Sequence, residues 1–232
     1  MSGKYMAYVG SYSYTGKAKG ITVFDVDVEN GMFKERCEIE VDNSSYVIAS
    51  SDGKTLYSIA DEGVVSFRIL PNGSLARLNS SSIRGMRGCH LCTDEEDKYV
   101  FVSGYHDGKT TVLNLNPDGS VGKIVDGVFD RGYGSVAERN FRPHVTCTRR
   151  MPDNRFVLSV DNGIDQVKIY RFNDKEQKLV QVDAIRCDLE SAPRHFRYSK
   201  DGKFIYLMYE LKKAIEVYTY KTGDRAPVIE KI

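Results

Sequence analysis

Short runs of alternating apolar and polar residues recur along the whole chain and are separated by turns. In residues 191–220, the runs Phe204–Tyr209 and Ile215–Tyr220 are rich in β-branched and aromatic residues, and a third run, His195–Tyr198, leads into the turn Ser199-Lys200-Asp201-Gly202. An Asp-Gly pair between apolar runs is a strong hairpin signal. No segment keeps a 3.6-residue period, so we expect antiparallel strands and almost no helix.

The same pattern returns at intervals typical of a repeat protein. A basic residue followed by an apolar strand occurs five times, with spacings of 50, 44, 57 and 48 residues, at Lys4, Lys54, Lys98, Arg155 and Lys203. Propeller repeats have about 40–50 residues and form one four-stranded blade each. The longest interval contains a charged insertion, Asp130–Arg142, which we expect to be a loop over one face. The prediction is an all-β fold, a β-propeller with about five four-stranded blades in this chain.

The first and last repeats are incomplete in the sequence. The first supplies three strands, and the fifth reaches its fourth strand at Val228–Ile232. We treat residues 1–232 as one propeller domain and expect it to be the first part of a seven-bladed ring; the alternative is a five-bladed ring closed in an unusual way. Unpaired strand edges favour association, so we also expect self-association through open blade edges.

Composition excludes several classes of protein. Hydrophobic residues make up 41% and charged residues 28%, which fits a globular protein, and the net charge of +1 provides no field for nucleic acid or anionic membrane. No apolar run approaches the roughly 18 residues that a spanning helix needs. The N-terminus lacks the pattern of a signal peptide, and the five scattered cysteines read as reduced thiols. We therefore expect a cytoplasmic protein without a nucleic-acid or membrane partner.

Two sets of polar residues recur at fixed positions in the repeats. The residues seven positions after each basic residue are Ser11, Asp61, Tyr105, Asn162 and Glu210. In a propeller, equivalent positions encircle the axis, so this set predicts a polar ligand pocket; the alternative is that these are ordinary turn residues. Eight or nine positions before the basic residues lie Tyr46, His90 and the pair Arg194-His195, and His144 lies eleven before, an offset that one turn insertion would explain.

These residue types suit acid–base and anion chemistry. Histidine is the usual general acid or base near neutral pH. A fixed guanidinium such as Arg194 binds a carboxylate or phosphate through two parallel hydrogen bonds. The alternatives are histidines bonded to backbone and a structural Arg194–Glu210 ion pair. Cys89 and Cys92 lack a second cysteine pair and read as packing thiols rather than a metal site, and glycine-rich phosphate loops and nucleophile-elbow motifs are absent.

Three segments, residues 88–112, 142–170 and 192–218, resemble the lactonase family of seven-bladed propellers, which includes bacterial 6-phosphogluconolactonase and fungal carboxymuconate cyclase. The Pro-His pair at His144, the Pro-Arg-His run at Arg194 and the Glu-Leu pair at Glu210 stand in the family's order and spacing. The family's C-terminal blades, which carry a further functional arginine, have no counterpart in this sequence.

The resemblance implies hydrolysis of an anionic sugar lactone, 6-phosphogluconolactone of the pentose phosphate pathway, without a metal or cofactor. His144 would take a proton from the attacking water, Arg194 would stabilise the anion, and Glu210 would orient Arg194 or move a proton. The residues expected to line the pocket are His90, His195, Asn162, Asp61 and Tyr105. Two alternatives stay open: a cyclase acting on a muconate-like diacid, and a non-catalytic propeller that binds proteins through one face.

Overall fold

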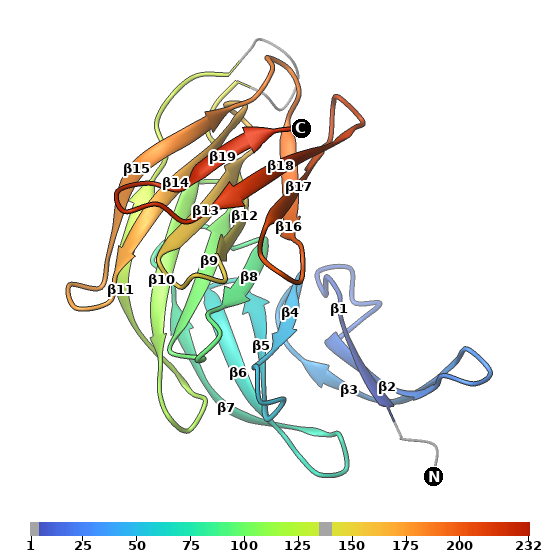
Figure 1. Ribbon diagram of the computed structural model, residues 1–232. Helices are drawn as coiled ribbons and strands as arrows, with labels where there is room; N and C mark the ends of the chain where they lie inside the picture. Colours follow the sequence, from blue (N-terminus) through green and yellow to red (C-terminus); the bar gives the residue numbers. More distant parts are fainter. Residues whose placement is uncertain (1–4, 135–140) are drawn as a thin grey trace.

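A computed structural model describes residues 5–134 and 141–232, in which all regular structure is β-strand (Figure 1). The strands form five antiparallel sheets, and within each sheet neighbours in the chain are neighbours in space. The first sheet has three strands, β1 (Tyr5–Gly10), β2 (Gly20–Asp27) and β3 (Met32–Glu40). The predicted strand repeats are confirmed, although Lys4 and part of the expected loop Asp130–Arg142 lie outside the described residues.

The other four sheets have four strands each. The second contains β4 (Val47–Ala49), β5 (Thr55–Ala60), β6 (Gly63–Ile69) and β7 (Leu75–Ser82). The third contains β8 (His90–Thr93), β9 (Tyr99–Gly104), β10 (Lys109–Leu115) and β11 (Val121–Phe129). The fourth contains β12 (Val145–Arg150), β13 (Phe156–Asp161), β14 (Gln166–Asn173) and β15 (Lys178–Arg186). The fifth contains β16 (Pro193–Tyr198), β17 (Phe204–Tyr209), β18 (Ile215–Lys221) and β19 (Val228–Lys231).

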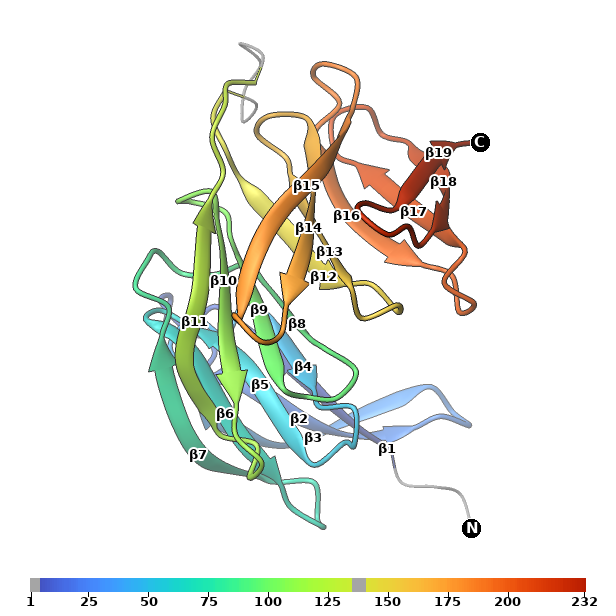
Figure 2. The same cartoon turned by 60° about the vertical axis from the view of Figure 1, so that its left-hand side comes forward.

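The sheets follow one another around an arc, as the blades of a propeller do (Figures 1 and 2). The first strand of each four-stranded sheet, β4, β8, β12 or β16, lies on the inner side of the arc (Figure 1). The sheets β1–β3 and β16–β19 lie at the two ends of the arc. The inner strands therefore bring residues that are distant in the sequence to one axis.

Hydrophobic cores lie between successive sheets rather than within one sheet. Tyr99 and Phe101 of β9 pack with Val157 and Tyr170 of the fourth sheet, whereas Val100, the residue between them, packs with the second sheet. Side chains alternate across a strand, so a middle strand that is covered on both faces is apolar throughout. This explains the continuous apolar runs in the sequence. Each of the four core clusters joins one sheet to the next.

The turn that joins β16 to β17 has the chemistry that its sequence predicts. The Gly202 amide donates to the Ser199 carbonyl at 2.9 Å, and the Ser199 hydroxyl donates to the Asp201 carboxylate at 2.6 Å. Gly202 has a φ of 70°, a conformation that glycine adopts without steric cost. The turn fixes the register in which Tyr198 of the inner strand β16 pairs with Ile205 of β17.

The fifth sheet leaves one apolar face exposed. Tyr206, Met208 and Ile215 are 42%, 44% and 65% exposed, and Met208 pairs directly with Ile215 across β17 and β18. Ile205 and Leu207, which alternate with them on β17, are buried against the fourth sheet. Across residues 5–134 and 141–232, no helix is long and apolar enough to cross a membrane.

Candidate active site

Two inner strands are interrupted by a β-bulge at equivalent places. The register of β12 shifts between Val145 and Cys147, and that of β16 shifts between Pro193 and His195. The extra residues are Thr146 and Arg194, and the Thr146 hydroxyl donates to the Arg194 carbonyl at 2.7 Å. A bulge redirects a side chain that regular pairing would hold against the neighbouring strand. The bulge in β16 thus sets the direction of the Arg194 side chain.

The first group of predicted residues is joined through Glu210. Arg194 Nη1 lies 2.9 Å from Glu210 Oε2, and the Asn162 side-chain amide donates to the same oxygen at 3.3 Å. Glu210 follows β17 and Asn162 follows β13, so the two residues occupy equivalent positions in neighbouring repeats. The side chains of Arg194 and Glu210 are 48% and 32% exposed, so the guanidinium is held in place and still faces solvent.

His144 lies immediately before β12 and is fixed by both its main chain and its ring. Its amide donates to Asp161 Oδ1 at 2.8 Å, and its carbonyl accepts from the Asn162 amide at 2.9 Å. Ring atom Nδ1 donates to the Tyr105 carbonyl at 2.7 Å, and the ring stacks on the Tyr105 ring at 4.2 Å. The side chain is 3% exposed, and burial lowers the pKa of His144 below its usual value. The imidazole is therefore neutral near pH 7, with the lone pair on Nε2.

Gly163 allows the close approach of the chain around His144. A Cβ atom at Gly163 would lie 1.7 Å from the Arg142 carbonyl oxygen and 2.8 Å from His144 Cδ2. Any side chain here must displace the backbone before the histidine, since no flexible group can give way. Glycine at this position is thus a requirement of the site.

A buried pair of carboxyl groups supports the main chain of His144. Asp161 Oδ1 accepts hydrogen bonds from the amides of His144 and Gly163, at 2.8 and 2.9 Å. Burial, with the neighbouring Asp130, raises the pKa of Asp161 to about 8. The Tyr170 hydroxyl donates to Asp130 Oδ1 at 2.9 Å, and burial raises the pKa of Asp130 as well. Because the pKa of Asp161 is about 8, the pair holds a proton near neutral pH.

The two parts of the site meet through Asn162 and Cys89. Asn162 bonds to the His144 carbonyl by its main chain and to Glu210 by its side chain. The Cys89 thiol donates to the Val145 carbonyl at 3.4 Å, and burial raises its pKa to about 12 despite the nearby positive charge of Arg194. Among the described residues, no hydrogen bond joins the His144 ring to Arg194, so the two share one end of the inner strands without direct contact.

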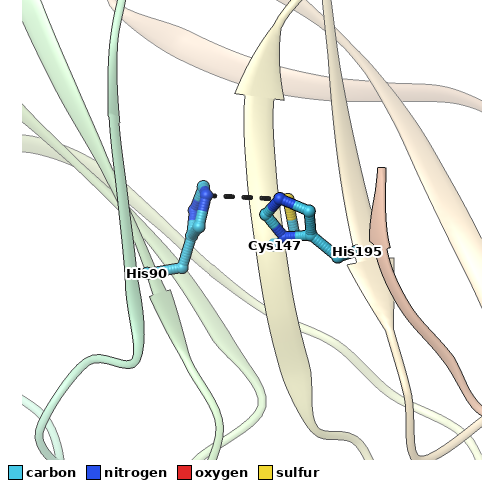
Figure 3. Close-up of side chains that lie close together, drawn as sticks. All are labelled: His90, Cys147 and His195. Atoms are coloured by element: carbon cyan, nitrogen blue, oxygen red, sulfur yellow. Dashed lines mark hydrogen bonds between the residues drawn. The ribbon is translucent and has the colours of Figure 1, made fainter. Parts of the chain in front are cut away.

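His90 and His195 lie together in a second group on the axis. Figure 3 shows the two rings side by side. Their centroids are 5.3 Å apart, and the Tyr46 ring packs on His90 at 4.7 Å. The prediction that His144 occupies the equivalent position of the fourth repeat is wrong. Cys147 occupies it, eight residues before Arg155, and its sulfur lies 3.7 Å from His90 Nε2. His144 lies three residues before Cys147 and precedes the bulge, so it belongs to a different position of the repeat.

Asp61 belongs to a separate polar contact. Its carboxylate accepts from Arg87 at 2.8 Å and from the Asn43 amide at 3.0 Å. Hydrogen bonds from Arg87 and Asn43 lower the pKa of Asp61 below its usual value. The role of Asp61 as a pocket residue stays a prediction.

Three residues near these groups are not predicted from the sequence: the buried Cys147 and Asp161, and the half-buried Arg149. Tyr46, His90 and His195 each lie eight residues before the basic residue of their repeat, and so does Cys147. This shared offset is the sequence signal that identifies Cys147. Asp161 ends β13 and carries no such signal, because its role depends on Asp130 in another sheet.

Comparison with known proteins places the chain in a family. Residues 6–228 match the sequence model described as Lactonase, 7-bladed beta-propeller. The chain belongs to this lactonase family. A member of known name, the 6-phosphogluconolactonase of Bacillus subtilis (strain 168), is 31% identical over 223 residues, which cover 94% of this chain and 63% of that protein. The 6-phosphogluconolactonase of Formosa agariphila is 27% identical, over 94% of this chain and 65% of its own length.

Solved structures agree with the family's fold. A crystal structure of a candidate 6-phosphogluconolactonase from Bacteroides fragilis superimposes with a TM-score of 0.88 and 30% identity, covering 100% of this chain and 67% of that one. The periplasmic gluconolactonase of Pseudomonas aeruginosa gives a TM-score of 0.88 at 24% identity, over 98% of this chain and 66% of that one. The propeller fold of this lactonase-family chain is thereby confirmed. The chain spans less than two thirds of the length of the first curated relatives that it matches.

Proposed function

We propose that the chain is a hydrolase that opens a sugar lactone, with 6-phosphogluconolactone as its substrate. Membership of the lactonase family and the names of its relatives support this activity. The observation that carries the residue assignment is the Arg194–Glu210 pair beside Asn162 and His144 at one end of the inner strands. This arrangement offers a fixed cation and a neutral imidazole at the mouth of the axis.

The proposed reaction begins with water. Nε2 of His144 accepts a proton as the water oxygen attacks the lactone carbonyl carbon. Tyr105 keeps the ring in the required tautomer, because its carbonyl accepts the Nδ1 proton. Arg194 stabilises the negative charge that develops on the carbonyl oxygen. The carbon–oxygen bond of the ring then breaks, and the proton held by His144 passes to the ring oxygen, either directly or through Glu210.

Glu210 acts mainly by orientation in this scheme. Its ion pair with Arg194 is partly exposed, and such pairs contribute only about 0–1 kcal/mol to stability. Substitutions at either residue should therefore leave the fold intact. A loss of activity in these variants would report on the reaction rather than on folding.

The test is direct. Hydrolysis of 6-phosphogluconolactone by the 232-residue chain should fall about 10²–10⁴-fold in His144→Ala and about 10²–10³-fold in Arg194→Met. Arg155→Met, which removes an exposed arginine bonded to the Asp224 carbonyl, is the matched control and should keep full activity. A wild-type chain that fails to accelerate hydrolysis, or two active-site variants with unchanged rates, would refute the proposal.

A further inference from the structure

One position recurs at the four inner strands, within the strand or just before it, and its side chains form a cluster on the axis. Each member lies eight residues before the basic residue of its repeat, and the four are Tyr46, His90, Cys147 and His195. His90 contacts Cys147 and His195, at 3.7 Å to the Cys147 sulfur and 5.3 Å to the His195 ring centroid (Figure 3). It also contacts the Tyr46 ring, at 4.7 Å between centroids. With Arg149, which lies two residues beyond Cys147 on β12, we call these residues the axial cluster.

The axial cluster has the ligand types of a metal site. One atom each of His90, Cys147 and His195 lies within 4.8 Å of the others, which is close to what a bound zinc or copper ion requires. Arg149 argues against this use. Its Nη2 lies 3.2 Å from His90 Nε2, so it donates to the lone pair that would bind the metal. A guanidinium is always charged, and a divalent cation would have to bind beside it.

The positive charge of Arg149 lacks a counter-charge. It contacts His90 Nε2, the Cys92 sulfur at 3.8 Å, Tyr46 and Cys147, none of which is a carboxylate. Among the described residues, no carboxylate lies within 4.0 Å of it, whereas the next residue, Arg150, pairs with Asp94 and Asp174. Buried charges in proteins are normally paired, because leaving one unpaired is costly. Arg149 is thus half-buried, fixed and available to an anion.

Two buried donors around Arg149 also lack an acceptor. Arg149 Nε has no hydrogen-bond partner in the structure, and neither does His90 Nδ1. Because His90 Nε2 accepts from Arg149, the proton of this neutral ring resides on Nδ1. The surroundings therefore offer donors and positive charge in excess of acceptors.

We propose that the axial cluster binds the phosphate group of the lactone substrate, with Arg149 as its principal cation. This inference rests on the proposed function and adds a second anion site to it. Thr146, which contacts Arg194, and Arg149 are three residues apart on β12, about 10 Å at roughly 3.3 Å per residue. A six-carbon sugar acid with a terminal phosphate is of comparable length. Its carbonyl end would meet Arg194, and its phosphate would meet Arg149.

Equilibrium binding to the 232-residue chain tests the assignment without requiring turnover. We expect 6-phosphogluconate to bind at least about tenfold more tightly than gluconate, which differs only by the phosphate. Arg149→Met should abolish this difference. It should not lower the melting temperature of the ligand-free protein, because it removes an unpaired charge and keeps a side chain of similar length. Arg155→Met should keep the difference. Arg149→Lys retains the charge without the planar guanidinium, so it should keep part of the difference in affinity. This variant replaces Arg149→Met in the test if the Met variant does not fold.

Three results would overturn the inference. One is equal affinity of the wild-type chain for 6-phosphogluconate and gluconate. If affinity is equal, binding of inorganic phosphate at Arg149 does not rescue the inference, because the site then does not hold the phosphate of the sugar. The second is an undiminished difference in Arg149→Met. The third is stoichiometric binding of Co²⁺ with thiolate-to-cobalt absorption, which would make the cluster a metal site. If the chain is inactive but its preference for 6-phosphogluconate over gluconate depends on Arg149, only the proposed function is refuted. If the chain is active but shows no such preference, only this inference is refuted.

Discussion

At the residue scale, the protonation states of buried groups decide what the candidate site can do. His144 is neutral because burial lowers its pKa, and Asp161 is protonated because burial and Asp130 raise its pKa to about 8. Cys89 is a thiol because burial raises its pKa to about 12. Arg194 forms a partly exposed ion pair with Glu210. The site thus combines one neutral base with one paired guanidinium.

The lowered pKa of His144 predicts the pH dependence of hydrolysis. A general base must be unprotonated, so activity is lost as pH falls through its pKa. Because burial lowers this pKa below the usual 6.5, we expect the acidic limb of kcat/KM below pH 6.5. A pH–rate profile checks this, with the His144→Ala variant expected to lose the limb. A limb at or above pH 7 would contradict the assignment.

The Asp130–Asp161 pair predicts how stability changes with pH. The folded-state pKa of Asp161 is raised, so its contribution to stability is complete at low pH and is lost as pH rises from about 4 to about 8. Asp161→Asn keeps the acceptor for His144 and imitates the protonated acid. We therefore expect the variant to gain stability relative to wild type between pH 6 and pH 9, at about 1.4 kcal/mol per unit of pKa shift.

Urea titrations of both proteins at pH 6 and pH 9 measure this difference. Asp188→Asn is a suitable control, because the Asp188 side chain is 71% exposed and accepts from Lys212 at the surface. If the free energy of unfolding of the wild type does not fall relative to that of Asp161→Asn between pH 6 and pH 9, Asp161 is ionised in the folded protein.

At the element scale, bulges and close contacts place the functional side chains. The bulges of β12 and β16 set the positions of Thr146 and Arg194. Gly163 lets the turn after β13 approach the backbone before β12. Strand pairing alone would give an inner ring of regular side chains. The bulges at Thr146 and Arg194 interrupt this ring. They separate the end of the inner strands where Arg194 lies from the axial cluster further along these strands.

Gly163→Ala tests the close contact. The added Cβ would lie 1.7 Å from the Arg142 carbonyl, so the backbone on either side must move. We expect the free energy of unfolding to fall by about 1–3 kcal/mol. We also expect lactone hydrolysis to fall by a larger fraction than the amount of folded protein does. Gly127→Ala is the control, since its nearest neighbour is the flexible end of Lys109 at 3.1 Å. Equal stability of the two variants would contradict this account.

The sequence predicts the elements better than it predicts their irregularities. Turn chemistry and alternation locate the strands, and the repeat spacing indicates the propeller, because these signals are local or periodic. The bulge that separates His144 from the axial cluster depends on pairing with β13 and leaves no pattern in the sequence. Arg149 and Arg150 are adjacent and chemically alike. Only the folded chain shows that Asp94 and Asp174 pair with Arg150 and leave Arg149 without a carboxylate.

At the scale of the whole molecule, five sheets form an arc whose last sheet has one apolar face open to solvent. Tyr206, Met208 and Ile215 form this face. Family relatives are longer than this chain, which spans 63% of the first of them. The exposed face gives the predicted self-association a second route besides the unpaired strand edges.

We expect the 232-residue chain to self-associate through this face. Charged residues at the directly paired positions Met208 and Ile215 should oppose the contact, so the double substitution Met208→Lys and Ile215→Lys should shift the chain toward monomer. Light scattering after size exclusion, at several concentrations, measures the effect. Leu189→Lys, at an isolated residue that is 80% exposed, should leave the association unchanged. A wild-type chain that is monomeric at every concentration would rule the contact out.

The placement of the cores between sheets has a consequence for how the molecule opens. Each sheet is secured only by its neighbours, so the second, third and fourth sheets are held from two sides and the first and fifth from one. Local opening should therefore begin at the two ends of the arc, and amide hydrogens of β9 and β13 should exchange with deuterium more slowly than those of β2 and β18. The strands beside the axial cluster, β8 and β12, would then remain in place while the ends of the arc fluctuate.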